Sequence, residues 1–257
     1  MKKRPVCFLL SPLLFGMLLS ASAQTLVESS VEARFQIDLK VPDAALKPFL
    51  PEGWTLNVAA QGPAKDANLR LIFTDRLSIN GPDGKPVGKG SNRIAYLAAP
   101  AKDASGNNVQ LMIGGITGDA ADAPGPFGVY LPASRQDVHR ASTTDSAGLT
   151  IDTQDWVFEA KSGEHLEMHI KFEKAVGNRS NAMDAKFYSA KNPTFYQISH
   201  QQQVLDILKN VTTNPPDRVK EFSLKTRGGS YAKLFDGTEK VLSWDNILWI
   251  DRSVSTP

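Results

Sequence analysis

A stretch dense in glycine and proline, residues 114–133 (GGITGDAADAPGPFGVYLPA), constrains the fold of this chain most. It holds five glycines and three prolines and follows an apolar run. Glycine permits backbone angles that other residues avoid, and proline fixes φ, so this density predicts a sharp corner whose backbone another group can approach closely. If the chain has a pocket, we expect it at this corner.

Segments with period-2 alternation lie on both sides of the corner. Residues 35–41 alternate Phe, Ile, Leu and Val with polar residues, which is typical of a half-buried strand. Asp43 is expected to cap a short helical turn over residues 44–49, and residues 201–210 show helical spacing of Val and Leu. Further strands are predicted at 69–77, 219–226, 231–235 and 240–250, with a hairpin formed by 93–99 and 109–116. Many short strands and few helices predict one mainly β domain over residues 24–257, a barrel or a sandwich.

A second hairpin follows the corner, and its register can be derived. Residues 156–160 and 166–172 flank Lys161-Ser162-Gly163, and a three-residue loop with Gly163 in the left-handed region keeps the apolar faces of both strands together. This register leaves a polar face that carries His165, Glu167 and His169. The predicted pairs are Trp156 with Met168, Phe158 with Leu166, Glu159 with His165, and Asp155 with His169.

The first 23 residues are predicted to be a secretory signal peptide. Lys2, Lys3 and Arg4 precede an apolar run, and an Ala-Ser-Ala cleavage site ends at Ala23. Cleavage leaves 26 basic and 27 acidic residues, a net charge of −1, and removes Cys7, the only cysteine. A near-neutral chain without basic blocks argues against nucleic acid or membrane as the partner, and a chain without thiols has no disulfide, thiolate metal site or cysteine nucleophile. We therefore expect a secreted or periplasmic protein with a small-molecule partner.

Three segments carry a resemblance to a known family. They are FQIDLKVPDAALKPFLPEGW (residues 35–54), ANLRLIFTDRL (67–77), and the hairpin that leads into DAPGPFGVY (122–130). In this order of elements the chain resembles the acetoacetate decarboxylase-like superfamily. The resemblance implies a closed, cone-shaped antiparallel β-barrel with peripheral helices and a ligand cavity inside.

The sequence departs from this family at the catalytic positions. The decarboxylases carry a Pro-Lys-Lys after the corner, where one lysine forms an imine and its neighbour lowers the pKa of the first. Here residues 125–130 read GPFGVY, and the next lysine is Lys161. The family's carboxylate falls near Ile72 and its early arginine near Glu32, two residues before Arg34. No catalytic residue carries over, so we expect no Schiff-base decarboxylase.

The polar face of the second hairpin is the first candidate site. His165, Glu167 and His169 lie at i, i+2 and i+4, so two imidazoles and a carboxylate share one strand face and could ligate zinc or iron. The alternative, which we favour, is an exposed face on which Glu159–His165 and Asp155–His169 are cross-strand pairs. Lys171 on the same face would repel a cation, and no metal or other cofactor is predicted.

The remaining candidate ligand-binding residues are Arg70, Arg93, Phe127 and Tyr130. Each arginine lies in an apolar strand segment, and either of them pointing into a barrel could hold a carboxylate bidentately. The alternative is a structural ion pair with Asp75 or Asp119. Phe127 and Tyr130, at the corner, would supply apolar lining, since ligand cavities are mostly hydrophobic.

Three functions fit these observations. The first is binding of a small, partly apolar carboxylate or ketone in the barrel cavity without imine chemistry. The second is a lyase or hydrolase that acts on a related acid with acid–base residues such as His169, Glu167 and Arg93. The third is a barrel that has lost its cavity and its ligand.

Overall fold

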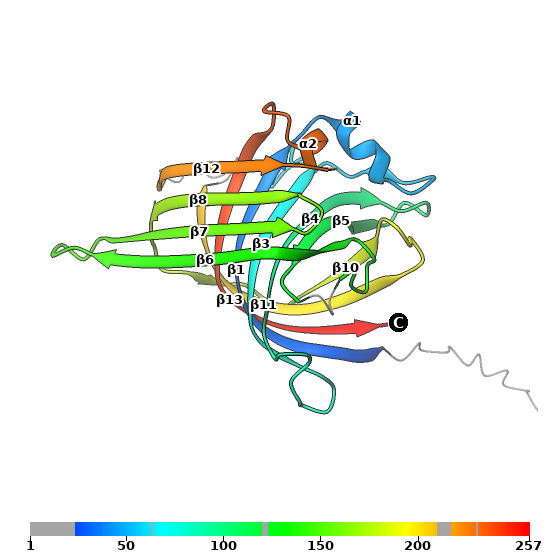
Figure 1. The fold of residues 1–257 in the computed structure, drawn as a ribbon, viewed down its shortest axis with the longest axis horizontal. Helices are drawn as coiled ribbons and strands as arrows, with labels where there is room; N and C mark the ends of the chain where they lie inside the picture. The colour runs from blue at the N-terminus through cyan, green and yellow to red at the C-terminus, as the bar shows by residue number, and fades with distance from the viewer. Residues whose placement is uncertain (1–23, 63, 120–122, 210–216, 230) are drawn as a thin grey trace, which may run out of the picture.

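The computed structural model describes residues 24–62, 64–119, 123–209, 217–229 and 231–257. The predicted signal peptide, residues 1–23, lies outside the described residues. The described chain is mainly strand, with short helical segments at its periphery, so the predicted fold class is confirmed (Figure 1). None of its helices is long and apolar enough to cross a membrane.

Within the described residues, seven strands close into a ring. Neighbouring ring strands are antiparallel except β5 and β10, which run parallel. Around the ring the order is β5, β10, β11, β13, β1, β3 and β4, and β4 pairs again with β5. The strands are β1 (Thr25–Lys40), β3 (Leu69–Asn80), β4 (Asn92–Lys102), β5 (Asn108–Thr117), β10 (Met183–Ser189), β11 (Tyr196–Lys209) and β13 (Lys240–Thr256).

Four further strands form a covering sheet against the outside of the ring. It joins the ring where β6 pairs in parallel with the end of β5, directly after the glycine- and proline-rich corner. In Figure 1 its strands cross in front of the ring strands. The covering sheet comprises β6 (Tyr130–Thr144), β7 (Thr150–Ala160), β8 (His165–Glu173) and β12 (Val219–Arg227); the small elements are α1 (Asp43–Leu46), η1 (Lys47–Phe49), β2 (Thr55–Leu56), β9 (Asn178–Arg179) and α2 (Tyr231–Leu234).

The main hydrophobic core lies between the ring and the covering sheet. Phe73 of β3 contacts Trp156 and Phe158 of β7 at ring-centroid distances of 5.8 and 6.1 Å. Phe35 of β1 meets Phe172 of β8 at 6.2 Å. These side chains are fully buried, and period-2 alternation turns the intervening residues of the ring strands toward the ring interior.

Both predicted hairpins are present. The strands β4 and β5 pair around the loop at 103–107, and β7 pairs with β8 in the predicted register, with Gly163 at φ +100°. Trp156 lies opposite Met168 and Asp155 opposite His169. Side-chain alternation and one turn glycine were therefore enough to derive this register.

The predicted helix at residues 201–210 is wrong, because residues 201–209 lie in strand β11; residue 210 lies outside the described residues. The strand pairs with β13 and β10, and its pairing with β13 shifts register between Val204 and Leu205 and again after Ile207. The first shift inserts Leu248 into β13, and the second inserts Leu208 into β11, which interrupts the period of two in β11. The resulting apolar spacing imitates a helix.

The predicted strand at 231–235 is also wrong, because its core is the short helix α2. Tyr231 and Leu234 are both buried, and residues three apart share a face of a helix but not of a strand. The expected Asp43 cap is corrected as well. Pro42 holds the cap position, and the Asp43 carboxylate instead accepts hydrogen bonds from Lys40 Nζ and Asn68 Nδ2, each at 2.7 Å.

Candidate functional site

A cavity of about 270 Å³ lies inside the ring, against the corner that the sequence singled out. All seven ring strands contribute to its wall, and residues 126, 127 and 130 close one side. The apolar part of the wall consists of Ile94, Met112, Phe127 and Phe187, with Tyr96 and Tyr130 beside them. The charged part consists of Glu28, Glu32, Arg34, Arg76 and Arg252.

Glycines at the corner allow Tyr130 to reach this wall. A Cβ atom on Gly115 would lie 2.7 Å from the Tyr130 ring and 2.8 Å from the Ala95 carbonyl oxygen, both too close for any larger residue. Gly125 and Gly128 adopt positive φ, which turns the chain so that Phe127 packs edge-on against Tyr130. The Phe127 carbonyl accepts a 2.5 Å hydrogen bond from Ser189 Oγ of β10.

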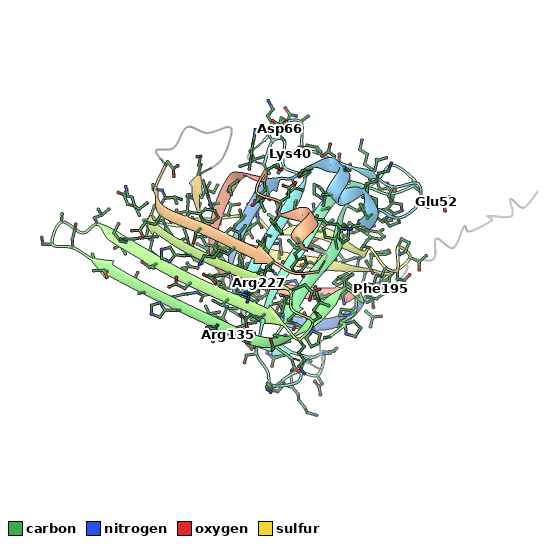
Figure 2. The ribbon with its side chains drawn as sticks, turned by 45° about the horizontal axis from the view of Figure 1, so that its top comes forward. Lys40, Glu52, Asp66, Arg135, Phe195 and Arg227 are labelled. Carbon is green, nitrogen blue, oxygen red and sulfur yellow. The ribbon has the colours of Figure 1, made fainter. Side chains whose placement is uncertain are left out.

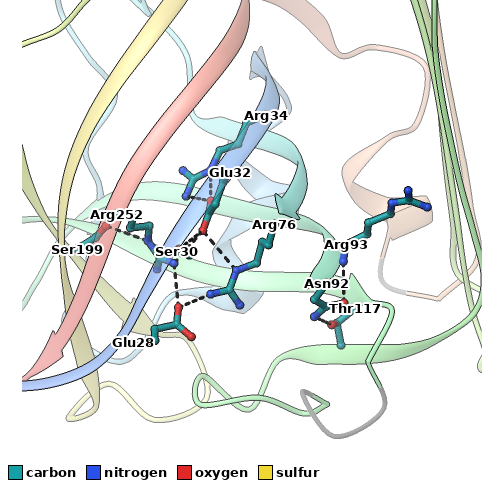
Figure 3. Close-up of polar contacts among 10 residues, drawn as sticks. All are labelled: Glu28, Ser30, Glu32, Arg34, Arg76, Asn92, Arg93, Thr117, Ser199 and Arg252. Atoms are coloured by element: carbon teal, nitrogen blue, oxygen red, sulfur yellow. Dashed lines mark hydrogen bonds and ion pairs between the residues drawn. The ribbon is translucent and has the colours of Figure 1, made fainter. Parts of the chain in front are cut away.

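Glu32 is the centre of the charged wall, which we call the cavity cluster: Glu28, Glu32, Arg34, Arg76 and Arg252 (Figure 3). Glu32 is 1% exposed. Its Oε2 accepts from Arg34 Nε at 2.7 Å, and its Oε1 accepts from Ser30 Oγ at 2.8 Å. The same Oε1 lies 3.3 Å from Arg252 Nη1 and 3.3 Å from Arg76 Nε. Three guanidinium groups from three strands thus converge on one carboxylate.

Opposing effects set the ionisation of this wall. Burial by itself would raise the pKa of Glu32, but the charges of Arg34, Arg252 and Arg76 outweigh it and hold the pKa well below its ordinary value. Burial raises the pKa of the Tyr130 hydroxyl, and the neighbouring Tyr96 adds to the shift. Near neutral pH the cavity therefore contains a carboxylate and a neutral phenol.

The cavity cluster has one positive charge in excess. Arg76 and Arg252 share the second carboxylate, Glu28, so three guanidinium groups face two carboxylates. Among the described residues, Thr74 Oγ1 and Arg76 Nε, both buried, have no hydrogen-bond partner. Spare donors and a spare positive charge beside an apolar wall suit an anion with an apolar part.

The side chains that line the cavity, among the described residues, include no lysine, histidine or cysteine. The nearest part of the corner, residues 125–130, contains no lysine and contributes Phe127 and Tyr130 to the wall. No group of three or more His, Cys, Asp or Glu side chains in the described chain is placed to hold a metal ion.

The structure separates the six predicted ligand-binding residues. Phe127 and Tyr130 line the cavity. Arg70 faces the ring interior, because it pairs with Asp38 on the face that also carries Glu32, but it does not line the cavity. Arg93 lies outside the cavity and forms the expected ion pair with Asp75, at 3.3 Å, and it extends away from the cavity cluster in Figure 3.

A second group of charges inside the ring, the inner acidic cluster, consists of Gln36, Asp38, Arg70, Ser243 and Asp245. Asp38 accepts two hydrogen bonds from Arg70, at 2.7 and 3.2 Å, and Asp245 accepts one from Gln36 Nε2 at 3.2 Å. Burial and then the charge of Asp38 raise the pKa of Asp245 to about 7, against the opposing effect of Arg70. Arg70 thus pairs with Asp38, a partner that the sequence did not suggest.

Glu167 and His169 lie on the outward face of the covering sheet, far from the corner in the order of strands. His169 Nδ1 lies 2.6 Å from Asp155 Oδ1, and His165 Nδ1 lies 3.2 Å from Glu159 Oε1. The predicted cross-strand pairs are present, but the face is not exposed throughout, because His165 is only 7% exposed. Figure 2 labels Arg135 on β6 and Arg227 on β12, the strands that border this face.

The sequence reasoning did not select Glu32, Arg34, Arg76 or Arg252 as site residues. A signal for two of them existed, because the resemblance placed the family's early arginine near Glu32 and Arg34. Arg76 stands between Asp75 and Leu77, and Arg252 stands in the polar run Asp251-Arg252-Ser253, so no pattern in the sequence marks either of them as facing a cavity. Only closure of the ring turns their side chains inward.

Comparisons with known proteins agree with the fold. An acetoacetate decarboxylase-like enzyme from Sphingomonas wittichii RW1 superposes with a TM-score of 0.53 at 12% identity, over 91% of this chain and 92% of that chain. The enduracididine biosynthesis enzyme MppR, in complex with the condensation product of pyruvate and imidazole 4-carboxaldehyde, superposes with a TM-score of 0.51 at 10% identity, over 92% and 90%. No family model matches, and no curated protein sequence matches. At these identities the fold alone is shown, and it is that of the acetoacetate decarboxylase-like enzymes.

Proposed function

We propose that this chain binds a small, partly apolar carboxylate in the ring cavity by non-covalent contacts and forms no imine with it. The observation that carries the proposal is the cavity cluster, in which three arginines, Arg34 and Arg76 buried and Arg252 partly buried, face two glutamates. A bound carboxylate would balance the remaining charge and accept from the spare donors of Arg76 and Thr74. Keto acids are included, because the carboxylate is the group that the arginines recognise.

Two further observations support this proposal. The apolar side chains Ile94, Met112 and Phe187 give the cavity a wall for an aliphatic or aromatic part of the ligand. The two fold neighbours are an acetoacetate decarboxylase-like enzyme and an enzyme crystallised with a pyruvate condensation product. The cavity also argues against the third function, a filled barrel. The second function, with Glu167 and His169 as acid and base, gains no support, because neither residue lines the cavity.

Calorimetric titration with short aliphatic monocarboxylates, and with the amides of the same acids, tests the recognition of charge. The acids should bind and the neutral amides should bind at least about tenfold more weakly, because a hydrogen bond to a charged group is stronger than one to a neutral group. Arg76→Gln should weaken binding of the acids about tenfold or more. Arg93→Gln, which changes the same charge outside the cavity, should have no effect. Equal binding of acids and amides would refute the proposal.

The absence of imine chemistry has its own test. Borohydride reduction in the presence of acetoacetate, followed by intact mass measurement, should leave the mass of the protein unchanged. A stable adduct would show that a lysine reacts as in the decarboxylases, and would overturn this part of the proposal.

We also propose that residues 1–23 are cleaved and that the mature protein acts in a secreted or periplasmic location. The basic start, the apolar run and the Ala-Ser-Ala site support it. Fractionation of cells that express the full chain, with intact mass measurement, should find a form that begins at Gln24 outside the cytoplasm. An uncleaved cytoplasmic form would contradict this.

A further inference from the structure

A second cavity, of about 250 Å³, lies between the ring and the covering sheet. We call it the intersheet cleft. One wall comes from β6 and β7, including Arg140, Ser142 and Asp152, and the other from Ala33 of β1 and Asn246 of β13. Ala33 follows Glu32, so the two cavities lie on opposite faces of the β1 wall. Arg34 is the residue that borders both among the described residues.

A chain of hydrogen bonds fixes the orientation of the Asn246 amide in the wall of this cleft, and so which of its polar atoms is left free. Trp156 Nε1 donates to Gln154 Oε1 at 3.1 Å, and Gln154 Nε2 donates to Asn246 Oδ1 at 3.1 Å. An indole nitrogen can only donate, so the Gln154 amide must turn its oxygen toward it, and the orientation of Asn246 follows. The remaining atom, Asn246 Nδ2, is therefore a donor.

This donor is buried and unused. Asn246 is 4% exposed, and its Nδ2 has no hydrogen-bond partner in the described part of the chain. A buried amide N–H without a partner destabilises the folded protein, because the group loses its hydrogen bonds to water and gains none in return. A ligand in the cleft would remove this penalty if it presented an acceptor to Asn246.

Cations supply the second half of the site. Arg140 lies 3.4 Å from Asp75, which also pairs with Arg93, so one carboxylate is shared by two guanidinium groups. Burial lowers the pKa of Arg140, Asp75 opposes this shift, and the charge of Arg93 adds to it. On the far side, Lys174 and Asp152 pair at 3.4 Å. These ion pairs, within the described residues, bring three cations, Arg140, Arg93 and Lys174, to two carboxylates, Asp75 and Asp152.

We propose that the intersheet cleft is a second binding site, which takes the oxyanion group of a small molecule between Asn246 Nδ2 and the Arg140 guanidinium. The shared chemistry is that of a carboxylate or a phosphate. This site is separate from the ring cavity, and the proposal stands whether or not the ring cavity binds a carboxylate.

The test uses the full mature chain and the indole N–H signal of Trp156, which lies at the start of the amide chain and 4.7 Å beneath the Arg140 guanidinium. Acetate and inorganic phosphate are titrated separately at constant ionic strength while ¹H–¹⁵N NMR spectra are recorded. At least one of the two anions should shift this signal with saturation. Acetate alone would indicate carboxylate ligands, and phosphate alone would indicate phosphorylated ones.

Two variants and two controls make the test specific. Asn246→Asp keeps an acceptor for Gln154 but replaces the free donor with an anion, so the saturable shift should disappear. Arg140→Gln should weaken binding of the anion about tenfold or more. Because Arg140 is partly exposed, this variant tests the proposal even if Asn246→Asp does not fold. Arg135→Gln, on the outward face of the same strand, and Arg76→Gln, in the ring cavity, should leave the shift unchanged. No saturable shift with either anion, or an unchanged shift in Arg140→Gln, would overturn the proposal.

Discussion

The ring interior contains two charged clusters with opposite balances of charge. In the cavity cluster, Glu28 and Glu32 face three arginines. In the inner acidic cluster, Asp38 and Asp245 face Arg70 alone. Both clusters include residues on the inward face of β1. Glu32 of the cavity cluster lies near the middle of this strand, and Asp38 of the inner acidic cluster lies near its end.

Burial acts in the same direction on both carboxyl groups, so the neighbouring charges account for the difference between the pKa of Glu32 and that of Asp245. Burial raises the pKa of both Glu32 and Asp245, and in each it is the largest single effect. Three guanidinium groups reverse it for Glu32. For Asp245 the charge of Asp38 adds to it, and the pKa reaches about 7. The cavity cluster therefore favours a bound anion, and the inner acidic cluster favours a protonated carboxyl group.

The largest change in the free energy of unfolding is expected when the central carboxylate of the cavity cluster, Glu32, is removed. Glu32→Gln leaves three guanidinium groups, two of them buried, with one carboxylate, and loss of one partner of a buried ion pair costs about 3–5 kcal/mol. Urea unfolding of the variant should show a loss of this size in the free energy of unfolding.

A matched substitution on the outward face of the covering sheet is the control. Glu167 is 33% exposed and pairs with Lys225 at 2.6 Å, so Glu167→Gln should change the free energy of unfolding by about 1 kcal/mol or less. Equal losses in Glu32→Gln and Glu167→Gln would show that enclosure in the ring adds nothing to the interactions of Glu32.

The inner acidic cluster should make stability depend on pH in the opposite sense to Glu32. The pKa of Asp245 is raised from 3.8 to about 7 in the folded state, so its contribution to stability is complete below pH 3.8 and is lost as pH rises through 7. Glu32, whose pKa is lowered, contributes above pH 4.5 and loses its effect as pH falls.

Asp245→Asn isolates this contribution. Between pH 5 and pH 8 the wild-type protein should lose roughly 1–3 kcal/mol more stability than the variant, by the linkage between pKa and folding. Urea unfolding at both pH values measures the difference. Parallel pH profiles of the two proteins would mean that Asp245 titrates as an ordinary aspartate.

Asp38 should control the titration of Asp245. In Asp38→Asn, the like charge disappears and Arg70 is left to pair with Asp245, so the pKa of Asp245 should fall by about one unit or more, equivalent to about 1.4 kcal/mol. Carboxyl ¹³C NMR titration of the variant and the wild-type protein measures the shift. A titration midpoint that stays near 7 would assign the raised pKa to burial alone.

The sequence predicted most of the fold because local rules decide its strands and turns. The register of β7 and β8 followed from Gly163 and from the positions of Trp156 and Met168, and the corner at residues 114–133 marked the cavity. The strand β11 was missed because the extra residue Leu208, opposite which β13 has none, disturbs the period of two. Bulges depend on the neighbouring strand, which a single segment does not reveal.

The site was predictable only in part, for a related reason. Alternation shows that a strand has a polar face, but the pattern around Glu32 and Arg34 resembles that around Glu167 and His169. One face is enclosed by the ring and the other meets solvent, and this follows from closure through the pairing of β4 with β5. Phe127 and Tyr130 were found because their place beside the corner is a property of the chain itself.

The smallest effect on stability is expected for the pair Asp155–His169. It lies on the outward face of the covering sheet, where charges meet solvent instead of being enclosed in the ring. The two side chains are 43% and 35% exposed and lie 2.6 Å apart, so water and salt screen their attraction. A double-mutant cycle with Asp155→Asn and His169→Gln should give a coupling energy below about 1 kcal/mol, and added salt should reduce it further. The cycle is measured by urea unfolding at low and high salt. A coupling of several kcal/mol that resists salt would show that the outward face, like the ring, holds its charges in a site rather than in solvent.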